Sequence, residues 1–448
     1  MSETTFVQGL SRRRFLKTLG IGLSTLALAP ALGTAQGSQA SIRVGVLVPL
    51  IFNFPIGVSA QRGAQIAQDE INGSGGILGQ PVQLVVRDDQ LDPRKTSERF
   101  EELATDQQSV IIVGGFLDET VVPLVNNVLP RVKTPFLNTG TSTPATTDKV
   151  KEDYVNFKYY FRVMLDTNLL TQDTANAAKG LLVDELKLKK VSLVLEDDTF
   201  GRDYQRFLEE QLPGIGLSIV SAFRFPGERN FDFSAILSES AQSGAEAFIV
   251  SFIRDNGFGF VRQWFNLGPR LPVVGINVSG QAFEYWSNTE GRVISHVYAD
   301  AATGATAITE RTQPFFQKYV DQFKTAPAQP LYMAYTTYDS LFIFKQAVER
   351  IGEAPPDPSN ASAFANYREQ LVSAFEQTDL VGTVGRIRFQ GKDDPRPHDP
   401  FTRDPQTGQA LVVPKWVQWQ KDAAGKPDRK VVWPPEFRNS AFTLPPPK

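Results

Sequence analysis

A strand–helix–strand unit near the start of the chain constrains its fold more than any other stretch. Ile42–Val48 is a short apolar run that ends at a proline, and Val82–Val86 is a second apolar run, so both predict buried strands. Between them, apolar residues recur at helical spacing over Ser59–Ile71. Two strands joined by a helix in this way pair in parallel through a right-handed crossover. The loop after the first strand is therefore expected at the carboxyl edge of a sheet, where open α/β folds bind ligands.

Strands and helices continue to alternate along the chain in two sets. In the first set, further strands are predicted at Val110–Val113, Pro135–Leu137 and Phe161–Met164. In the second set, strands are predicted at Val191–Leu195, Leu217–Phe225, Ala247–Phe252 and Pro272–Ile276. The predicted fold class is therefore α/β, with two doubly wound lobes of similar size. Gly391–Gly408 is rich in Pro, Asp and Gly, which predicts an exposed loop.

The composition argues against several classes of function. The chain has 448 residues, a formal net charge of −3 and no cysteine. Because it has no broad basic field, we expect no nucleic-acid partner. Without thiols there are no disulfides, thiolate nucleophiles or thiolate metal sites. The two histidines, His296 and His398, lie far apart in the sequence, so we expect no metal site and no cofactor.

The first 40 residues have the order of zones found in an export signal. Ser11–Lys17 reads SRRRFLK, a mildly apolar run follows over Thr18–Leu32, and small residues suited to cleavage continue to Ala40. The pattern resembles the twin-arginine export signal. The alternative is a basic patch before a membrane anchor, but the apolar run is short for a bilayer span. We expect a signal peptide at residues 1–40 and a mature protein that is periplasmic or otherwise extracytoplasmic.

Four loop motifs together resemble those of one protein family. Ile71–Gly79 reads INGSGGILG, Asp88–Pro93 reads DDQLDP, a predicted strand ends in Val113-Gly114-Gly115, and Asp197–Gly201 reads DDTFG. In combination these motifs are similar to those of the type I periplasmic solute-binding proteins. That family includes the leucine/isoleucine/valine-binding proteins of ABC uptake systems. The resemblance covers most of the chain, from Ile42 to Trp433.

The resemblance implies two Rossmann-like lobes joined by three hinge crossovers. We place these crossovers near Val163–Asp166, Asn277–Gly280 and Thr378–Val381. Lobe one is then expected at residues 42–163 plus 279–379, lobe two at 164–278 plus 380–433, and a Pro-rich tail at 434–448. The resemblance also implies that the lobes close on a small-molecule ligand and that a membrane permease of an ABC transporter recognises the closed state. We expect the protein to be a monomer.

The candidate ligand contacts that the resemblance implies follow predicted strands: Asp118, Gly140, Thr141, Ser142, Phe200, Arg254 and Asn277. Asp118 stands where the family carries a Ser for the ligand's carboxylate. It suits an amide, ammonium or hydroxyl group instead, or it caps the helix that follows. Gly140, Thr141 and Ser142 either present backbone groups and hydroxyls to a polar ligand or satisfy their own turn.

Three further candidates come from the second lobe. Phe200 stands where the family packs an aromatic side chain over the ligand, although core packing is the commoner fate of Phe. Arg254 is suited to an anionic ligand, or it is exposed or paired with Asp255. Asn277 stands where amino-acid binders carry a Glu for the α-ammonium group. Asp118 and Asn277 therefore weaken the case for a simple α-amino acid.

These features predict the extracytoplasmic substrate-binding component of an ABC transporter. The expected ligand is a small polar organic solute, either an amino acid or a related amide or carboxylate. One alternative is a ligand sensor that passes closure to a signalling partner. A hydrolase using Asp88, Asp89 and Asp92 is less favoured, because carboxylates in a loop before a helix commonly cap that helix. The sequence also contains no nucleophile-elbow, Walker or zinc-protease motif. We expect no enzymatic activity.

Overall fold

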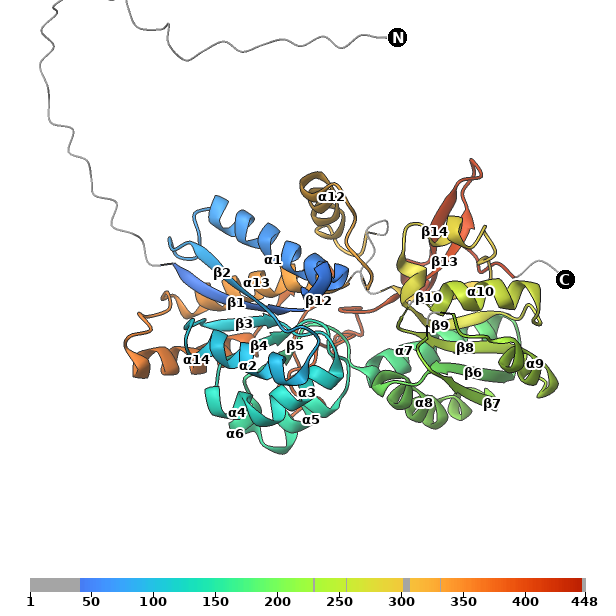
Figure 1. Cartoon of the computed structure of the whole chain (residues 1–448), viewed down its shortest axis with the longest axis horizontal. Coiled ribbons are helices and arrows are strands. Elements are labelled where there is room, and N and C mark those ends of the chain that lie inside the picture. The colour runs from blue at the N-terminus through green and yellow to red at the C-terminus, as the bar shows by residue number, and fades with distance from the viewer. Residues whose placement is uncertain (1–40, 229, 255, 301–306, 331, 445–448) are drawn as a thin grey trace, which may run out of the picture. The chain divides into compact units, whose positions relative to one another are not determined.

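Two separate sheets with flanking helices form the core of the computed structural model (Figure 1). It describes residues 41–444 apart from residues 229, 255, 301–306 and 331. The predicted signal peptide at residues 1–40 lies outside the described residues. Within the described ranges, no helix is long and apolar enough to cross a membrane.

The first sheet is parallel throughout, with the strand order β2-β1-β3-β4-β5. Its strands are β1 (Ile42–Val48), β2 (Val82–Asp88), β3 (Ile111–Gly114), β4 (Phe136–Asn138) and β5 (Tyr160–Arg162). All four residues of β3 and all but one of β1 are buried, as expected for parallel strands covered on both faces. The predicted strand–helix–strand unit is thus present.

Nine helices described in the first lobe surround this sheet. They are α1 (Pro55–Gly73), α2 (Pro93–Ala104), α3 (Asp118–Asn127), α4 (Leu129–Val132), α5 (Ala145–Glu152), α6 (Tyr154–Phe157), α12 (Thr312–Phe323), α13 (Tyr332–Ile351) and α14 (Ala361–Phe375). A two-stranded hairpin of β11 (Leu380–Val381) and β12 (Arg386–Ile387) follows. The core of the lobe draws on α13 and α14, which come from the later part of the chain.

The second sheet has the order β14-β13-β10-β9-β8-β6-β7. Its strands are β6 (Lys190–Glu196), β7 (Ser218–Phe225), β8 (Ala247–Phe252), β9 (Val273–Asn277), β10 (His296–Asp300), β13 (Lys415–Lys421) and β14 (Pro427–Trp433). The pairs β10–β13 and β13–β14 are antiparallel, and the others are parallel. Its helices are α7 (Thr167–Ala178), which a π-helical segment continues to Glu185, α8 (Thr199–Gln211), α9 (Ser234–Gln242), α10 (Asn256–Asn266) and α11 (Tyr285–Asn288).

The lobe boundaries differ from the predicted ones at two crossovers. Because β10 pairs with β9 and β13, the chain stays in the second sheet beyond the predicted crossover at Asn277–Gly280. The third crossover lies later than Thr378–Val381, because Phe389 and Val412 still pack in the core of the first lobe. The apolar pattern of a strand does not encode which sheet it joins, since tertiary packing decides its neighbours.

Part of the predicted exposed loop Gly391–Gly408 is buried. His398 and Asp399 have no exposed surface, and the His398 ring stacks on Phe161 with centroids 3.8 Å apart. Asp399 Oδ1 lies 2.9 Å from Nε of Arg162, which is itself fully buried. A buried guanidinium needs a nearby anion, so this contact ties the loop to the end of β5.

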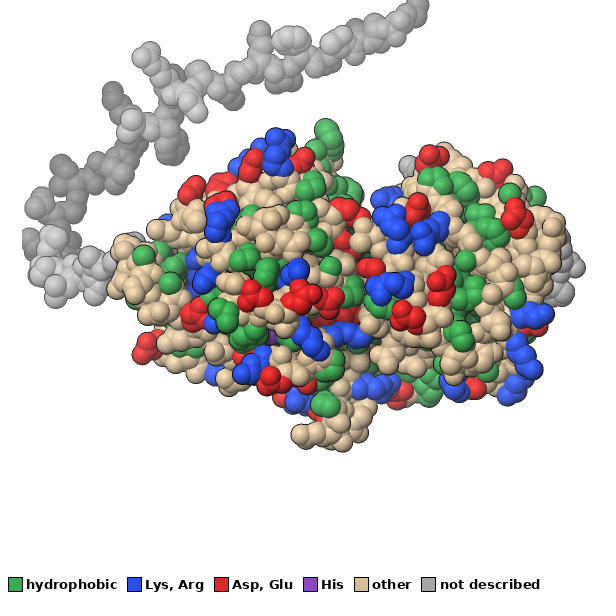
Figure 2. All heavy atoms as spheres, turned by 90° about the horizontal axis from the view of Figure 1, so that it is seen from below, with side chains coloured by type: hydrophobic (Ala, Val, Ile, Leu, Met, Phe, Trp, Pro, Cys, Tyr) green, Lys and Arg blue, Asp and Glu red, His purple; other side chains and the backbone are tan. Residues whose placement is uncertain are grey.

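Charge on the face shown in Figure 2 is mixed, with acidic and basic side chains interspersed. This distribution agrees with the formal net charge of −3.

Candidate functional site

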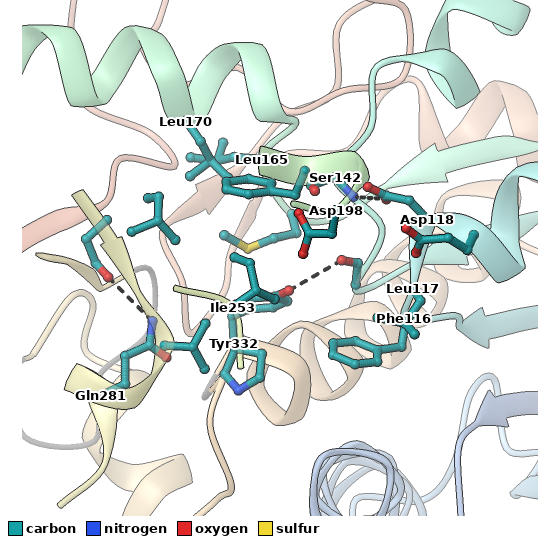
Figure 3. Close-up of a pocket in the computed structure, with 18 residues that line it drawn as sticks. Phe116, Leu117, Asp118, Ser142, Leu165, Leu170, Asp198, Ile253, Gln281 and Tyr332 are labelled. Atoms are coloured by element: carbon teal, nitrogen blue, oxygen red, sulfur yellow. Dashed lines mark hydrogen bonds between the residues drawn. The ribbon is translucent and has the colours of Figure 1, made fainter. Parts of the chain in front are cut away.

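A pocket is lined by loops that follow strands of both sheets (Figure 3). In the first lobe, lining residues follow β3, β4 and β5, and in the second lobe they follow β6, β8 and β9. The lining consists of Phe116, Leu117, Asp118, Glu119, Gly140, Ser142, Met164, Leu165, Leu170, Asp198, Phe200, Ile253, Ile276, Val278, Gln281, Ala299, Pro330 and Tyr332. The pocket encloses about 880 Å³, including its opening to solvent. It therefore lies at the carboxyl edges of both sheets, where α/β folds bind ligands.

Apolar side chains form most of this pocket. Phe116, Met164 and Leu165 come from the first lobe, and Phe200 and Ile253 come from the second. The Phe200 ring stacks on Tyr204 with centroids 5.3 Å apart, which fixes its orientation. A wall of this kind favours a ligand with an apolar body.

Asp118 contributes a buried carboxylate to the pocket. It is the first residue of α3, and its Oδ1 accepts the backbone N–H groups of Ser142 at 2.9 Å and Thr143 at 3.1 Å. Burial raises the pKa of Asp118 to about 6, although these two hydrogen bonds act in the opposite direction. Asp118 does not cap α3, because the cap position is Leu117. Its carboxylate instead joins the loop after β3 to the loop after β4.

A second carboxylate, Asp198, comes from the other lobe. Its Oδ1 accepts the backbone N–H of Gly201 at 2.7 Å and so caps α8. Burial also raises the pKa of Asp198 to about 6. Figure 3 shows Asp118, Asp198 and Ser142 at one end of the pocket and Gln281 at the opposite end. We call the three lining carboxylates Asp118, Glu119 and Asp198 the acidic end.

Hydrogen bonds between α8 and the first lobe lie beside the acidic end. The Thr199 hydroxyl donates to Glu119 Oε1 at 2.8 Å, and the Thr143 hydroxyl donates to Asp203 Oδ2 at 3.3 Å. Each bond links a loop or helix of the first lobe to α8 or its cap. Separation of the lobes would break both bonds, so they stabilise the arrangement in which the pocket is lined from both sides.

The structure brings four of the seven predicted contacts together in the pocket: Asp118, Gly140, Ser142 and Phe200. Thr141 does not line it, because its N–H donates to Asn138 Oδ1 at 3.0 Å and its hydroxyl accepts from the same side chain at 3.3 Å. Asn277 is also held within the protein, since its amide donates to the Tyr285 hydroxyl at 2.9 Å.

Arg254 also does not line the pocket. It pairs with the buried carboxylate of Glu196, which also accepts the backbone N–H groups of Ile253 and Arg254 at 3.0 and 3.1 Å. More than half of the Arg254 side chain is exposed. Its place after β8 agrees with the prediction, but Glu196, at the end of β6, holds its charge.

Several lining residues are missed by the sequence reasoning. Asp198 lies in the DDTFG motif, so the motif itself is the signal that could have identified it. Leu165 and Ile253 directly follow predicted strands and could have been found in the same way. Tyr332 has no local signal. It opens α13, and its hydroxyl donates to the Gly140 carbonyl at 3.3 Å.

The carboxylates near β2 have the structural role that the sequence favours. Asp92 caps α2 by accepting the N–H groups of Arg94 at 2.9 Å and Lys95 at 2.8 Å. Asp88 accepts the N–H of Leu50 at 2.7 Å. Among the described residues, no group of three or more His, Asp or Glu side chains is placed to hold a metal ion.

Comparison with known proteins identifies the family. A family profile described as periplasmic binding protein matches residues 41–402, which is most of the chain. The chain belongs to the periplasmic binding protein family. Proteins of this family bind solutes and are not enzymes, in agreement with the sequence-based expectation.

Relatives and solved structures support this membership in the periplasmic binding protein family. A protein of Pseudomonas aeruginosa named "Amino acid binding protein" is 24% identical over 379 residues, which cover 84% of this chain and 95% of that protein. An ABC transporter substrate-binding protein from Sphaerobacter thermophilus superposes with a TM-score of 0.71 at 19% identity, covering 89% of this chain and 99% of that one. The branched-chain amino acid transporter substrate binding protein LivJ from Streptococcus pneumoniae, in complex with isoleucine, gives a TM-score of 0.66 at 18% identity, covering 88% and 100%. The predicted two-lobed α/β fold is thus confirmed.

Proposed function

We propose that this periplasmic binding protein is the extracytoplasmic substrate-binding component of an ABC transporter and captures one small organic solute between its lobes. The observation that carries the proposal is the pocket lined by loops of both sheets. A pocket shared in this way can be opened for entry and closed for retention by movement of one lobe against the other.

The proposed mechanism is closure driven by the solute. A solute held by Phe116 and Leu117 of the first lobe gains contacts with Phe200 and Ile253 of the second lobe when the lobes meet. A ligand shifts such an equilibrium only by its difference in affinity for the two states. The contacts available only in the closed state supply this difference, and the closed surface is what a membrane permease would recognise.

The proposed solute is of amino-acid size and related in chemistry to amino acids or amides. Two observations support this class. The curated relative is named as an amino-acid binder and the LivJ structure holds isoleucine. The apolar wall around Phe116, Leu165 and Phe200 suits an aliphatic or aromatic side chain.

We also propose export by the twin-arginine route, on the basis of the SRRRFLK segment at Ser11–Lys17. Replacing Arg12 and Arg13 together with Lys should retain the unprocessed protein in the cytoplasm. Cell fractionation that finds the variant exported as efficiently as the wild type would reject this route.

A thermal-shift panel tests the binding function. The mature protein, purified without residues 1–40, is screened against amino acids, amides, urea, aromatic acids, amines and sugars. A solute present at a hundred times its dissociation constant should add about 2.7 kcal/mol to the free energy of unfolding. The Phe200→Ala variant should show a smaller ligand-induced shift, whereas Val155→Ala, at a residue that is 66% exposed and does not line the pocket, should keep the full shift. A folded protein that responds to no solute would contradict the proposal.

A further inference from the structure

The charges that line the pocket are all of one sign. Asp118, Glu119 and Asp198 are acidic, and the described lining contains no Lys or Arg. Asp118 and Asp198 come from different lobes, and Figure 3 shows them at the same end of the pocket. A solute that enters this end meets two carboxylates that are largely shielded from water.

The two arginines nearest to this end, Arg162 and Arg254, lie outside the described pocket lining. Arg162 lies 2.9 Å from Asp399 and donates to the Thr143 carbonyl at 2.8 Å. Arg254 pairs with Glu196 and also forms a longer ion pair with Asp198, at 3.7 Å. The charge of Asp198 is thus partly balanced by Arg254, whereas no basic side chain of the described lining faces Asp118.

The backbone donors at this end are also occupied. Asp118 Oδ1 accepts from both Ser142 and Thr143, and Asn138 Oδ1 accepts from Thr141. A carboxylate on the solute would thus find these N–H groups already used by a carboxylate of the protein. It would also be repelled by Asp118 and Asp198, because like charges brought together in a poorly hydrated site oppose ionisation and binding.

We infer that the solute is an organic cation, with an amine or amidine group at the acidic end, an apolar body against Phe116, Leu165 and Phe200, and no carboxylate beside the cation. This inference rests on the proposed function and narrows the class of solute. Asp118 is the specificity-determining residue, since its carboxylate occupies the loop donors that an anionic group on the solute would need. A charged hydrogen bond to an ammonium group then replaces the lost hydration of both partners.

Matched compounds separate the candidate head groups. Leucine is a zwitterion, isovalerate carries only the acid, isovaleramide only the amide, and isoamylamine only the ammonium, on closely similar apolar bodies. Phenylalanine and phenethylamine provide an aromatic pair. Isothermal titration calorimetry on the mature protein should find that each amine binds at least tenfold more tightly than its zwitterion and that isovalerate does not bind.

The Asp118→Asn variant tests the assigned residue. Asparagine keeps the oxygen that accepts from Ser142 and Thr143 but removes the charge, so amine affinity should fall about 10- to 100-fold while amide affinity changes little. Asp198→Asn provides an independent variant if Asp118→Asn does not fold. Glu152→Gln, at an exposed residue of α5 that pairs with Lys149, is the control and should bind as the wild type does.

The pH profile gives a second readout. The pKa values of Asp118 and Asp198 lie at about 6, so both are charged above pH 7 and protonated well below pH 6. Amine affinity should therefore fall as the pH decreases through 6, and Asp118→Asn should reduce this dependence. The charged groups that act on the two carboxylates are Glu119, Arg162, Glu196 and Arg254, and Tyr332 faces Asp118 from α13.

The outcomes distinguish this inference from the proposed function. If leucine or isovalerate binds more tightly than isoamylamine, the cation inference is wrong and the transport role stands. The cation inference is also wrong if a neutral sugar or amide alone binds, or if Asp118→Asn and Asp198→Asn both leave amine affinity unchanged. If no member of either panel binds to the folded protein, the proposed function itself fails.

Discussion

His296 is a fully buried imidazole in β10, and neither of its ring nitrogens hydrogen-bonds to a described residue. It lies against Trp264, with ring centroids 4.5 Å apart, and near Phe260. Burial in these apolar surroundings lowers the pKa of His296 to about 3, from an ordinary value of 6.5. The folded protein therefore holds this side chain neutral where an unfolded chain would protonate it.

This difference predicts an acid sensitivity that can be assigned to one residue. Because the folded pKa is lowered, the unfolded state binds the extra proton, and the free energy of unfolding falls as the pH decreases below 6.5 by about 1.4 kcal/mol per pH unit. His296→Leu removes this contribution without removing a described hydrogen bond. Urea denaturation at pH 7.5, 6.5, 5.5 and 4.5 should show the variant gaining stability relative to the wild type at each step below about pH 6.5. If the free energy of unfolding falls by the same amount in both proteins as the pH decreases, the assignment to His296 is wrong.

The roles of individual site residues depend on partners that are distant in the sequence. Asp118, Gly140, Ser142 and Phe200 follow predicted strands and line the pocket. Arg254 also follows a strand but lies outside the pocket lining, because its guanidinium donates a hydrogen bond to Glu196, which lies 58 residues earlier. No local pattern around Arg254 encodes this pairing, since it is created only when β6 and β8 become neighbours.

At the scale of elements, the close packing of α1 against α13 anchors the later part of the chain to the first lobe. Gly63 lies on the face of α1 that meets α13, and a Cβ built there would be 2.2 Å from the Ala334 carbonyl oxygen. Figure 1 shows the two helices on the same side of the first sheet. The contact depends on the absence of a side chain at Gly63, because displacing backbone atoms of α13 would disturb the close packing of the core at a cost in free energy.

We predict that Gly63→Ala destabilises the protein by about 1–3 kcal/mol through overpacking at this contact. Gly73→Ala is the matched control, because Gly73 is in the last turn of the same helix and a Cβ added there would meet nothing within 4 Å. The control should be neutral or stabilising by up to about 1 kcal/mol. Thermal or urea denaturation of both variants measures the difference, and equal stability of Gly63→Ala and wild type would show that α13 can shift.

The sequence predicts the elements better than their assignment to lobes. Apolar runs locate β1 and β2, and apolar periodicity over Ser59–Ile71 locates most of α1, because these segments bury one face or both. It does not predict that β10 joins the second sheet or that Asp399 is buried beside Arg162. The pairing of β10 with β13 and the contact of Asp399 with Arg162 both join segments more than a hundred residues apart, for which a single sequence contains no local signal.

At the scale of the whole molecule, the two lobes share one pocket and make polar contacts across it. The Thr199–Glu119 and Thr143–Asp203 hydrogen bonds lie between groups that are partly accessible to solvent, so each contributes modestly to holding the lobes together. Contacts of this modest strength are compatible with solute-driven closure, in which the additional contacts made by the solute decide the balance between open and closed forms.

Binding of a small solute between the two lobes is the central claim. A crystal structure of the mature protein with the solute that gives the largest thermal shift tests it most directly. We predict density for that solute in the pocket, in contact with Phe116 of the first lobe and Phe200 of the second, with its polar head at Asp118 and Asp198. A solute bound to one lobe only, or outside an empty pocket, would contradict the claim.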